Sequence, residues 1–165
     1  MESDLHKILK KKLSPAVAAQ KIESWCAYQE RSQQEARNKL YEYGLHKNEV
    51  EQIIINLIEH NFLNEERFAL AYAGGKFRIK KWGKIKIKSA LRAKQVSEYC
   101  VNKALQQINL NDYFATLEKI ILQKNNQLKE ADKIKRKQKL FLFASSKGYE
   151  SNIISEILKE LKDGL

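Results

Sequence analysis

The sequence predicts an all-α protein made of three tandem three-helix repeats in an elongated, curved array. Apolar residues recur at spacings of three and four along most of the chain, the period of an amphipathic helix, and no stretch alternates with period two between turn residues. The 165 residues include one proline and six glycines, so residues that interrupt helices are few. A chain of this length that is 43% hydrophobic can bury a core.

The first predicted repeat, residues 14–62, follows a charged N-terminal tail at residues 1–13. A helix at about residues 15–29 is expected because Ser14 can cap it and Pro15 stands at the first helical position, where a missing N–H costs nothing. The side chains expected to face its core are those of Val17, Ala18, Ile22, Trp25 and Cys26.

Two more helices complete this repeat. Ser32 and Glu35 have the spacing of a capping box, which predicts a helix start, and Gly44 suits the left-handed conformation that follows a helix end. This helix is expected to bury Ala36 and Leu40. The next helix, at about residues 48–60, has one apolar face, formed by Val50, Ile53, Ile54 and Leu57.

The same apolar pattern returns twice when Gly44 is aligned with Gln95 and Gly148. The matched sets are Ala36/Ile87/Leu140, Leu40/Leu91/Ala144, Leu45/Val96/Tyr149, Val50/Val101/Ile154, Ile53/Ala104/Ile157, Ile54/Leu105/Leu158 and Leu57/Ile108/Leu161. Amphipathic helices can align by chance, but agreement over this many positions without a gap favours a true repeat. A period near 50 residues indicates stacked helical modules, and we place the second at residues 63–109 and the third at residues 110–165.

The first helix of each later repeat aligns poorly, so its start is taken from local signals. Asn64 is expected to cap a helix whose first turn carries Glu65 and Glu66, the charge sign that the helix dipole prefers there. Its packing residues are expected to be Phe68, Ala69, Ala71, Tyr72 and Phe77. In the third repeat we expect Asn111 to cap a helix that buries Phe114, Leu117, Ile120 and Ile121, a second helix at about residues 134–146, and Ser151 to cap the last helix.

Positive charge is concentrated in one segment. Residues 76–94 contain nine basic side chains and no acidic one, in a chain whose formal net charge is +11. Such a block favours a polyanionic partner over the alternative of a merely soluble basic protein, in which the excess would be spread over the surface.

Within this segment, Lys84, Lys88 and Arg92 are spaced by four and form one stripe on a helix. Like charges at this spacing cost a few tenths of a kcal/mol per pair, which favours a phosphate-facing surface over an ordinary solvated face. Trp82 could stack on bases, although an aromatic residue beside a helix start is more often part of the core. The candidate binding residues are Lys76, Arg78, Lys80, Lys81, Trp82, Lys84, Lys86, Lys88, Arg92, Lys94, Lys133, Arg136 and Lys137.

Signals for catalysis, metals and membranes are missing from the sequence. Residues 74–76 lack the remaining positions of a phosphate-binding loop, and the three histidines have no metal-ligand spacing. Cys26 and Cys100 are too few for a disulfide framework, and no window reaches the length of a membrane span or a signal peptide. We therefore expect a cytoplasmic monomer that is not an enzyme and has no cofactor.

Several spaced motifs resemble the RecX family, the regulators of the bacterial recombinase RecA. Residues 62–72 (FLNEERFALAY) and 82–96 (WGKIKIKSALRAKQV) are similar to the middle of the family's sequence. Residues 31–45 (RSQQEARNKLYEYGL) resemble its opening motif, and residues 146–149 (SKGY) its third repeat. The chain departs from the family pattern at Glu65 (usually Asp), Ala36 (usually Leu), Lys84 (often Pro) and Gln95 (usually Gly).

The resemblance implies a protein of three three-helix repeats that lies in the groove of a RecA filament on single-stranded DNA. Such a protein would restrain the filament's ATP hydrolysis, strand exchange and co-protease activity, with no catalytic residue of its own. The family's basic second-repeat surface would correspond to Lys84, Lys88 and Arg92, with Lys80, Lys81 and Lys86 nearby. The residues alone leave open a general helical nucleic-acid-binding protein, or a membrane-surface or scaffold protein. The last reading is disfavoured because no strongly apolar face stands opposite the basic block.

Overall fold

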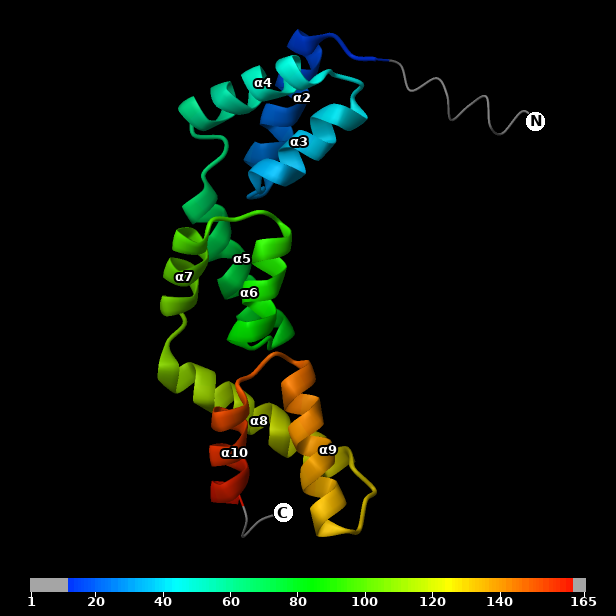
Figure 1. Cartoon of the computed structure of the whole chain (residues 1–165), viewed down its shortest axis with the longest axis vertical. Helices are drawn as coiled ribbons and strands as arrows, with labels where there is room; N and C mark the ends of the chain where they lie inside the picture. Colours follow the sequence, from blue (N-terminus) through cyan, green and yellow to red (C-terminus); the bar gives the residue numbers. More distant parts are fainter. Residues whose placement is uncertain (1–11, 162–165) are drawn as a thin grey trace, which may run out of the picture. The chain divides into compact units, whose positions relative to one another are not determined.

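The computed structural model describes residues 12–161, and over that range it contains nine α-helices and no strand, which confirms the all-α fold class (Figure 1). The helices are α2 (Pro15–Tyr28), α3 (Gln33–Glu42), α4 (Lys47–Glu59), α5 (Glu65–Lys80), α6 (Lys84–Ala93), α7 (Glu98–Gln106), α8 (Leu110–Gln127), α9 (Lys133–Ser146) and α10 (Ser151–Glu160). The predicted charged tail at residues 1–13 lies outside the described residues except for Lys12 and Leu13.

The described residues divide into two compact units. The first runs up to Phe68 and includes Lys94–Ser97, and the second consists of Ala69–Ala93 and the residues from Glu98 onward. The division falls inside α5, so this helix contributes to both units. The predicted boundaries of three repeats, at residues 62/63 and 109/110, stay a prediction.

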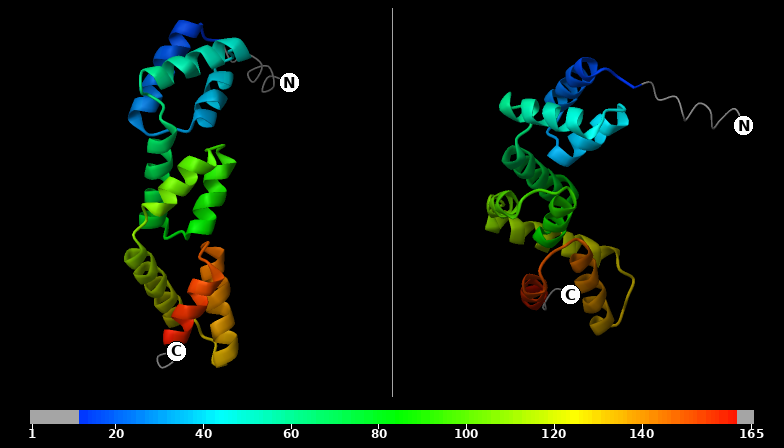
Figure 2. Two further views of the ribbon diagram at one scale, coloured as in Figure 1. Left: turned by 60° about the vertical axis from the view of Figure 1, so that its left-hand side comes forward. Right: turned by 45° about the horizontal axis from the view of Figure 1, so that its top comes forward.

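In the first unit, α2, α3 and α4 pack against one another around a single apolar core (Figures 1 and 2). The predicted caps are confirmed: the Ser14 hydroxyl accepts from the Val17 amide at 3.4 Å. The Ser32 hydroxyl accepts from the Glu35 amide at 3.1 Å, and the Glu35 carboxylate accepts from the Ser32 amide at 2.9 Å. Since the caps satisfy amides at the starts of α2 and α3, the first turn of each is held in place.

Most residues expected in the cores are buried, and the exceptions follow helix geometry. In α2 the buried residues Ala18, Ile22 and Cys26 are spaced by four, so Val17 lies about 100° away and is 42% exposed, contrary to expectation. The same reasoning applies in α5, where Ala69, Ala73 and Phe77 form the buried face. Ala71, which was expected to pack, is exposed.

The backbone confirms the repeat alignment. Gly44, Gln95 and Gly148, the aligned positions, have φ angles of 85°, 58° and 92°, so all three are left-handed. All seven aligned apolar sets are buried except at Leu105 and Leu161, which are half-buried. Gln95 therefore ends α6 in the conformation that glycine adopts at the other two sites, at a cost of about 1–2 kcal/mol for a residue with a Cβ.

In the second unit, the turn before α6 fits against the turn between α9 and α10. The Gly83 amide donates to the carbonyl of Lys147 at 2.8 Å, and the Ile85 amide donates to the carbonyl of Gly148 at 3.0 Å. A Cβ atom on Gly83 would overlap with the backbone of Gly148 and Tyr149. This contact between two glycines, which we call the glycine joint, therefore requires that position 83 carry no side chain.

Tyr113 of α8 is fully buried and forms hydrogen bonds to both turns of the glycine joint. Its hydroxyl donates to the Glu150 carboxylate at 2.6 Å and accepts from the Lys84 amide at 2.9 Å. Its ring centroid lies 4.9 Å from that of Tyr149, whose hydroxyl donates to the Lys81 carbonyl at 3.1 Å. Burial and the hydrogen bond to Glu150 raise the pKa of Tyr113, so the phenol stays protonated as a donor.

Two helix starts in the third repeat differ from expectation. Asn109, not Asn111, caps α8, because its side-chain oxygen accepts from the Asp112 amide at 3.1 Å. The buried face of α8 then runs through Tyr113, Leu117, Ile120 and Ile121, and Phe114 is only half-buried. Glu150, not Ser151, is the residue that precedes α10, and its side chain is engaged with Tyr113.

The glycine joint makes a direct prediction about stability. Gly83→Ala should lower the free energy of unfolding by about 2–3 kcal/mol, because the added methyl group must push apart backbone atoms in the joint. Gly75→Ala is the matched control: apart from its chain neighbours and the backbone of its own helix, no atom lies within 4 Å of a Cβ there. Alanine also favours a helix over glycine by about 0.5–1 kcal/mol. Urea unfolding of both variants checks this, and equal midpoints would contradict it.

Gln95 offers the opposite change. Gln95→Gly should raise the free energy of unfolding by about 0.5–1 kcal/mol, because relief of the left-handed strain exceeds the entropy cost of glycine. Gly44→Ala, at the equivalent position of the first repeat, should be destabilising. Thermal unfolding measures both, and a destabilised Gln95→Gly would show that the residue is not strained.

Candidate nucleic-acid interface

Helix α6 presents the predicted basic stripe on a fixed backbone. Ile87 and Leu91 are fully buried, and the first turn is held by the glycine joint and by the bond from the Lys84 amide to Tyr113. Lys84, Lys88 and Arg92 follow one another at four-residue spacing beside this buried face. The structure therefore brings these three candidates together on one element.

One carboxylate from α7 partly balances the stripe. Arg92 donates through its guanidinium to Glu98, with Nη2 3.0 Å from Oε2, and the Lys88 ammonium lies 3.8 Å from the same carboxylate. The hydrogen bond from Arg92 holds the pKa of Glu98 below its ordinary value. Two cations thus share one anion. The side chains of Lys88 and Arg92 are 35% and 53% exposed, so the stripe keeps an excess of positive charge at the surface.

Aromatic rings interleave with the lysines at the start of α6. The ammonium groups of Lys76 and Lys86 lie over the Trp82 ring, 4.9 and 4.8 Å from its centroid, and that of Lys84 lies 5.1 Å from the Tyr113 centroid. Trp82 is half-buried, so its ring is partly accessible. Cations over an aromatic face are stabilised by its quadrupole, and this orders the lysine side chains before any ligand arrives.

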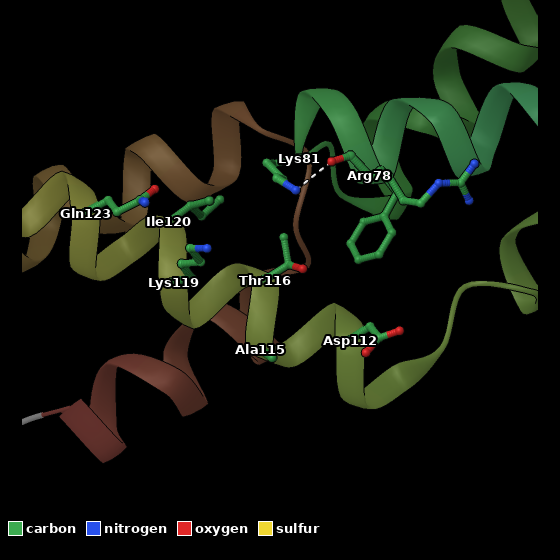
Figure 3. A pocket seen from close by; sticks show the side chains of 9 residues that line it. Arg78, Lys81, Asp112, Ala115, Thr116, Lys119, Ile120 and Gln123 are labelled. Atoms are coloured by element: carbon green, nitrogen blue, oxygen red, sulfur yellow. Dashed lines mark hydrogen bonds between the residues drawn. The ribbon is translucent and has the colours of Figure 1, made fainter.

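A cleft extends the basic surface from the end of α5 onto α8 (Figure 3). Its volume is about 460 Å³, and its charged lining residues are Arg78, Lys81, Lys119 and Asp112. The Lys81 ammonium donates to the Arg78 carbonyl at 2.5 Å, and Thr116 and Gln123 of α8 add polar groups to the lining. Lys119 was missed from sequence because it follows Glu118 in a helix of mixed charge, with no basic run to mark it.

Two candidates have structural partners. The Lys94 ammonium donates to the Glu35 carboxylate at 2.6 Å inside the first unit. Burial acts to raise the pKa of Glu35, but the bonds from Lys94 and Ser32 outweigh it and lower the pKa. Arg136 donates to the backbone carbonyls of Asn125 at 3.1 Å and Glu130 at 2.9 Å. These hydrogen bonds stabilise the loop between α8 and α9.

The remaining candidates are Lys80 on α5 and Lys133 and Lys137 on α9. Lys80 is exposed at the end of α5, while Lys133 and Lys137 are exposed on α9. The Ser146 carbonyl, at the end of α9, accepts a hydrogen bond from the Lys86 ammonium at 3.3 Å, so this end of α9 lies beside α6. Lys137 is nine residues earlier, about 14 Å along the helix. The α9 lysines therefore form a cluster separate from the stripe.

Other site chemistry is sparse in the described part of the chain. Residues 12–161 hold no group of three His, Cys, Asp or Glu side chains placed to share a metal ion. No helix in that range has the length and apolar character to cross a bilayer. Cys26 and Cys100 are both buried, and burial raises the pKa of the Cys26 thiol to about 11.

Comparisons with known proteins agree with the motifs. The profile for the second three-helix domain of RecX matches residues 64–105, and that for the third three-helix domain matches residues 111–158. The regulatory protein RecX of Clostridium perfringens (strain 13) is 38% identical over 133 residues, which are 79% of this chain and 62% of the relative. That of Clostridium acetobutylicum is 32% identical over 135 residues, with the same shares. The chain thus spans about three fifths of the length of these relatives.

A solved structure shows the same fold. The crystal structure of RecX from Lactobacillus salivarius superposes with a TM-score of 0.81 at 20% identity, covering 90% of this chain and 96% of that one. At this identity the likeness concerns the fold.

The shared carboxylate gives a prediction about affinity. Glu98→Gln should tighten binding to a single-stranded oligonucleotide about two- to fivefold, because Lys88 and Arg92 lose the carboxylate that competes with phosphate for them. Glu156→Gln, at an exposed site on α10, makes the same change in net charge and is the control. Fluorescence anisotropy measures both, and equal effects would mean that only net charge matters.

Proposed function

The chain belongs to the RecX family, and we propose that it binds the RecA recombinase filament on single-stranded DNA and restrains its ATPase, strand-exchange and co-protease activities. It acts as a regulator and not as an enzyme, in keeping with the name "regulatory protein" that its relatives carry. We further propose three three-helix repeats at residues 14–62, 63–109 and 110–165, and a cytoplasmic monomer.

The observation that carries this proposal is the basic stripe of α6, which lies within the residues matched by the profile of the second RecX domain. Lys84, Lys88 and Arg92 are held on a helix whose other face is buried, so their charges are presented without much rearrangement. Charges fixed in advance lose less freedom on binding. Contacts of this kind reach phosphates and carry no sequence information, as suits a protein that acts along a filament whatever its DNA sequence.

The restraint follows from how binding affects an equilibrium. A ligand that binds one conformation of a filament better than another shifts the population toward the first. A stiff basic module that contacts phosphates and acidic groups at fixed spacings favours the filament geometry that matches those spacings. Steps that require another geometry, including turnover of ATP, then become slower.

The alternative is a general nucleic-acid-binding protein without sequence preference. The cleft with Arg78, Lys81 and Lys119, and the accessible edge of Trp82, suit bare single strands as well as a filament. The two functions differ in one measurable respect: a regulator of the filament binds it more tightly than it binds the same DNA without recombinase.

The first test measures the ATPase of RecA on single-stranded DNA with and without this protein. We expect inhibition at protein concentrations well below those that cover the DNA. Inhibition that begins only when the DNA is saturated, with no higher affinity for the filament than for bare DNA, would favour the alternative.

The second test removes the stripe. The triple variant Lys84→Ala, Lys88→Ala, Arg92→Ala should bind DNA and filament more weakly, and the slope of log affinity against log salt should fall by about 0.7 for each lost phosphate contact. A variant with Lys21, Lys47 and Lys129 changed to Ala loses the same charge at exposed sites elsewhere and is the control. Unchanged slopes in the folded stripe variant would count against the proposed surface.

A further inference from the structure

We propose that the groove between α9 and α10 binds an acidic amphipathic peptide segment of a partner protein, with an apolar side chain of the peptide seated in the groove. The groove has a volume of about 300 Å³ and is lined by Ile134, Lys137, Gln138, Phe141, Ser155, Leu158 and Lys159. It lies within the second unit and does not include the stripe of α6, so the proposal stands independently of the function proposed above.

Three of the residues that line the groove are large and apolar. Leu158 is 1% exposed, Phe141 is half-buried, and Ile134 is 73% exposed. A large aliphatic side chain left this open beside a concave apolar surface gains free energy when another apolar group covers it.

The charged residues in the lining are both lysines, Lys137 on α9 and Lys159 on α10. On α10, Glu156 and Glu160 lie more than about 90° around the helix from the centre of the lining residues. On the approach to α9, Asp132 is occupied as the helix cap, and Glu130 accepts from Lys139 at 2.9 Å. Among residues 12–161, no carboxylate therefore lines this apolar groove, and its two cations match an acidic ligand.

The spacing of the lining residues selects the shape of the ligand. Ile134, Lys137, Gln138 and Phe141 follow one face of α9, and Ser155, Leu158 and Lys159 follow one face of α10. A groove between two helices accepts an amphipathic helix whose apolar residues recur at the same three- and four-residue intervals. A nucleic acid would fit less well, because it has phosphates for the lysines but no aliphatic side chain for Ile134 and Leu158. Lys137, a nucleic-acid candidate from sequence, is here assigned to the peptide.

The test uses a fluorescein-labelled peptide, Glu-Glu-Leu-Asp-Glu-Leu-Leu-Asp-Glu, with the full chain. We expect saturable binding by anisotropy, with backbone amide shifts in NMR spectra concentrated at residues 134–141 and 155–159. A peptide with Ser in place of the three leucines, and one with Asn and Gln in place of the acids, should each bind at least about tenfold more weakly.

Variants of the protein locate the site. Ile134→Ser should weaken binding about tenfold, from the loss of apolar burial, and a Lys137→Glu, Lys159→Glu double variant should weaken it at least as much. The controls are Leu142→Ser, which removes a 66% exposed apolar side chain that does not line the groove, and Lys135→Glu, a charge reversal on the same helix. Both controls should change affinity less than about twofold.

Several results would overturn the proposal. These are no binding up to about 1 mM peptide, equal weakening by Leu142→Ser and Ile134→Ser, or amide shifts centred on α6. Equal affinity for the leucine-free peptide would also overturn it, as would displacement of the peptide by oligothymidylate that shifts the same amides, because the groove would then be a site for charge or for nucleic acid.

Discussion

The contact between Gly83 and Gly148 is the constraint on which the basic surface depends. Two turns can approach at backbone distance only because the first has no side chain, and this approach lets the Gly83 and Ile85 amides bond to the second turn. The Tyr113 hydroxyl then accepts a hydrogen bond from the first amide of α6, that of Lys84. The placement of the lysines around Trp82 therefore follows from contacts between backbone atoms, and the surface needs no ligand to be organised.

Positive charge in this chain has two uses. Lys94 and Arg136 satisfy carboxylate and carbonyl oxygens within the fold, whereas Lys84, Lys88 and Arg92 stand on a helix face and share at most one carboxylate. A surface that binds a polyanion needs charges of the second kind, since charges of the first kind cannot leave their partners without exposing unsatisfied groups. The count of nine basic residues in one segment is thus larger than the number of charges that a ligand can reach.

Local patterns in the sequence were enough to predict the helices, most caps and the repeated core. The alignment even anticipated that Gln95 takes the place of a glycine, and its left-handed backbone confirms this. The roles of Tyr113, Glu98 and Arg136 could not be predicted, because each depends on partners brought together only by folding. Tyr113 forms hydrogen bonds with Lys84 and Glu150, which are 29 and 37 positions away in the sequence. The local sequence pattern around Tyr113 contains no sign of either partner.

Hydrogen exchange of this protein, alone and bound to a RecA filament on single-stranded DNA, tests the central claim most directly. If the surface organised by the glycine joint meets the filament, amides of the segment at residues 76–94 should gain the strongest protection. Protection confined to residues 14–60, with residues 76–94 exchanging as in the free protein, would contradict the account.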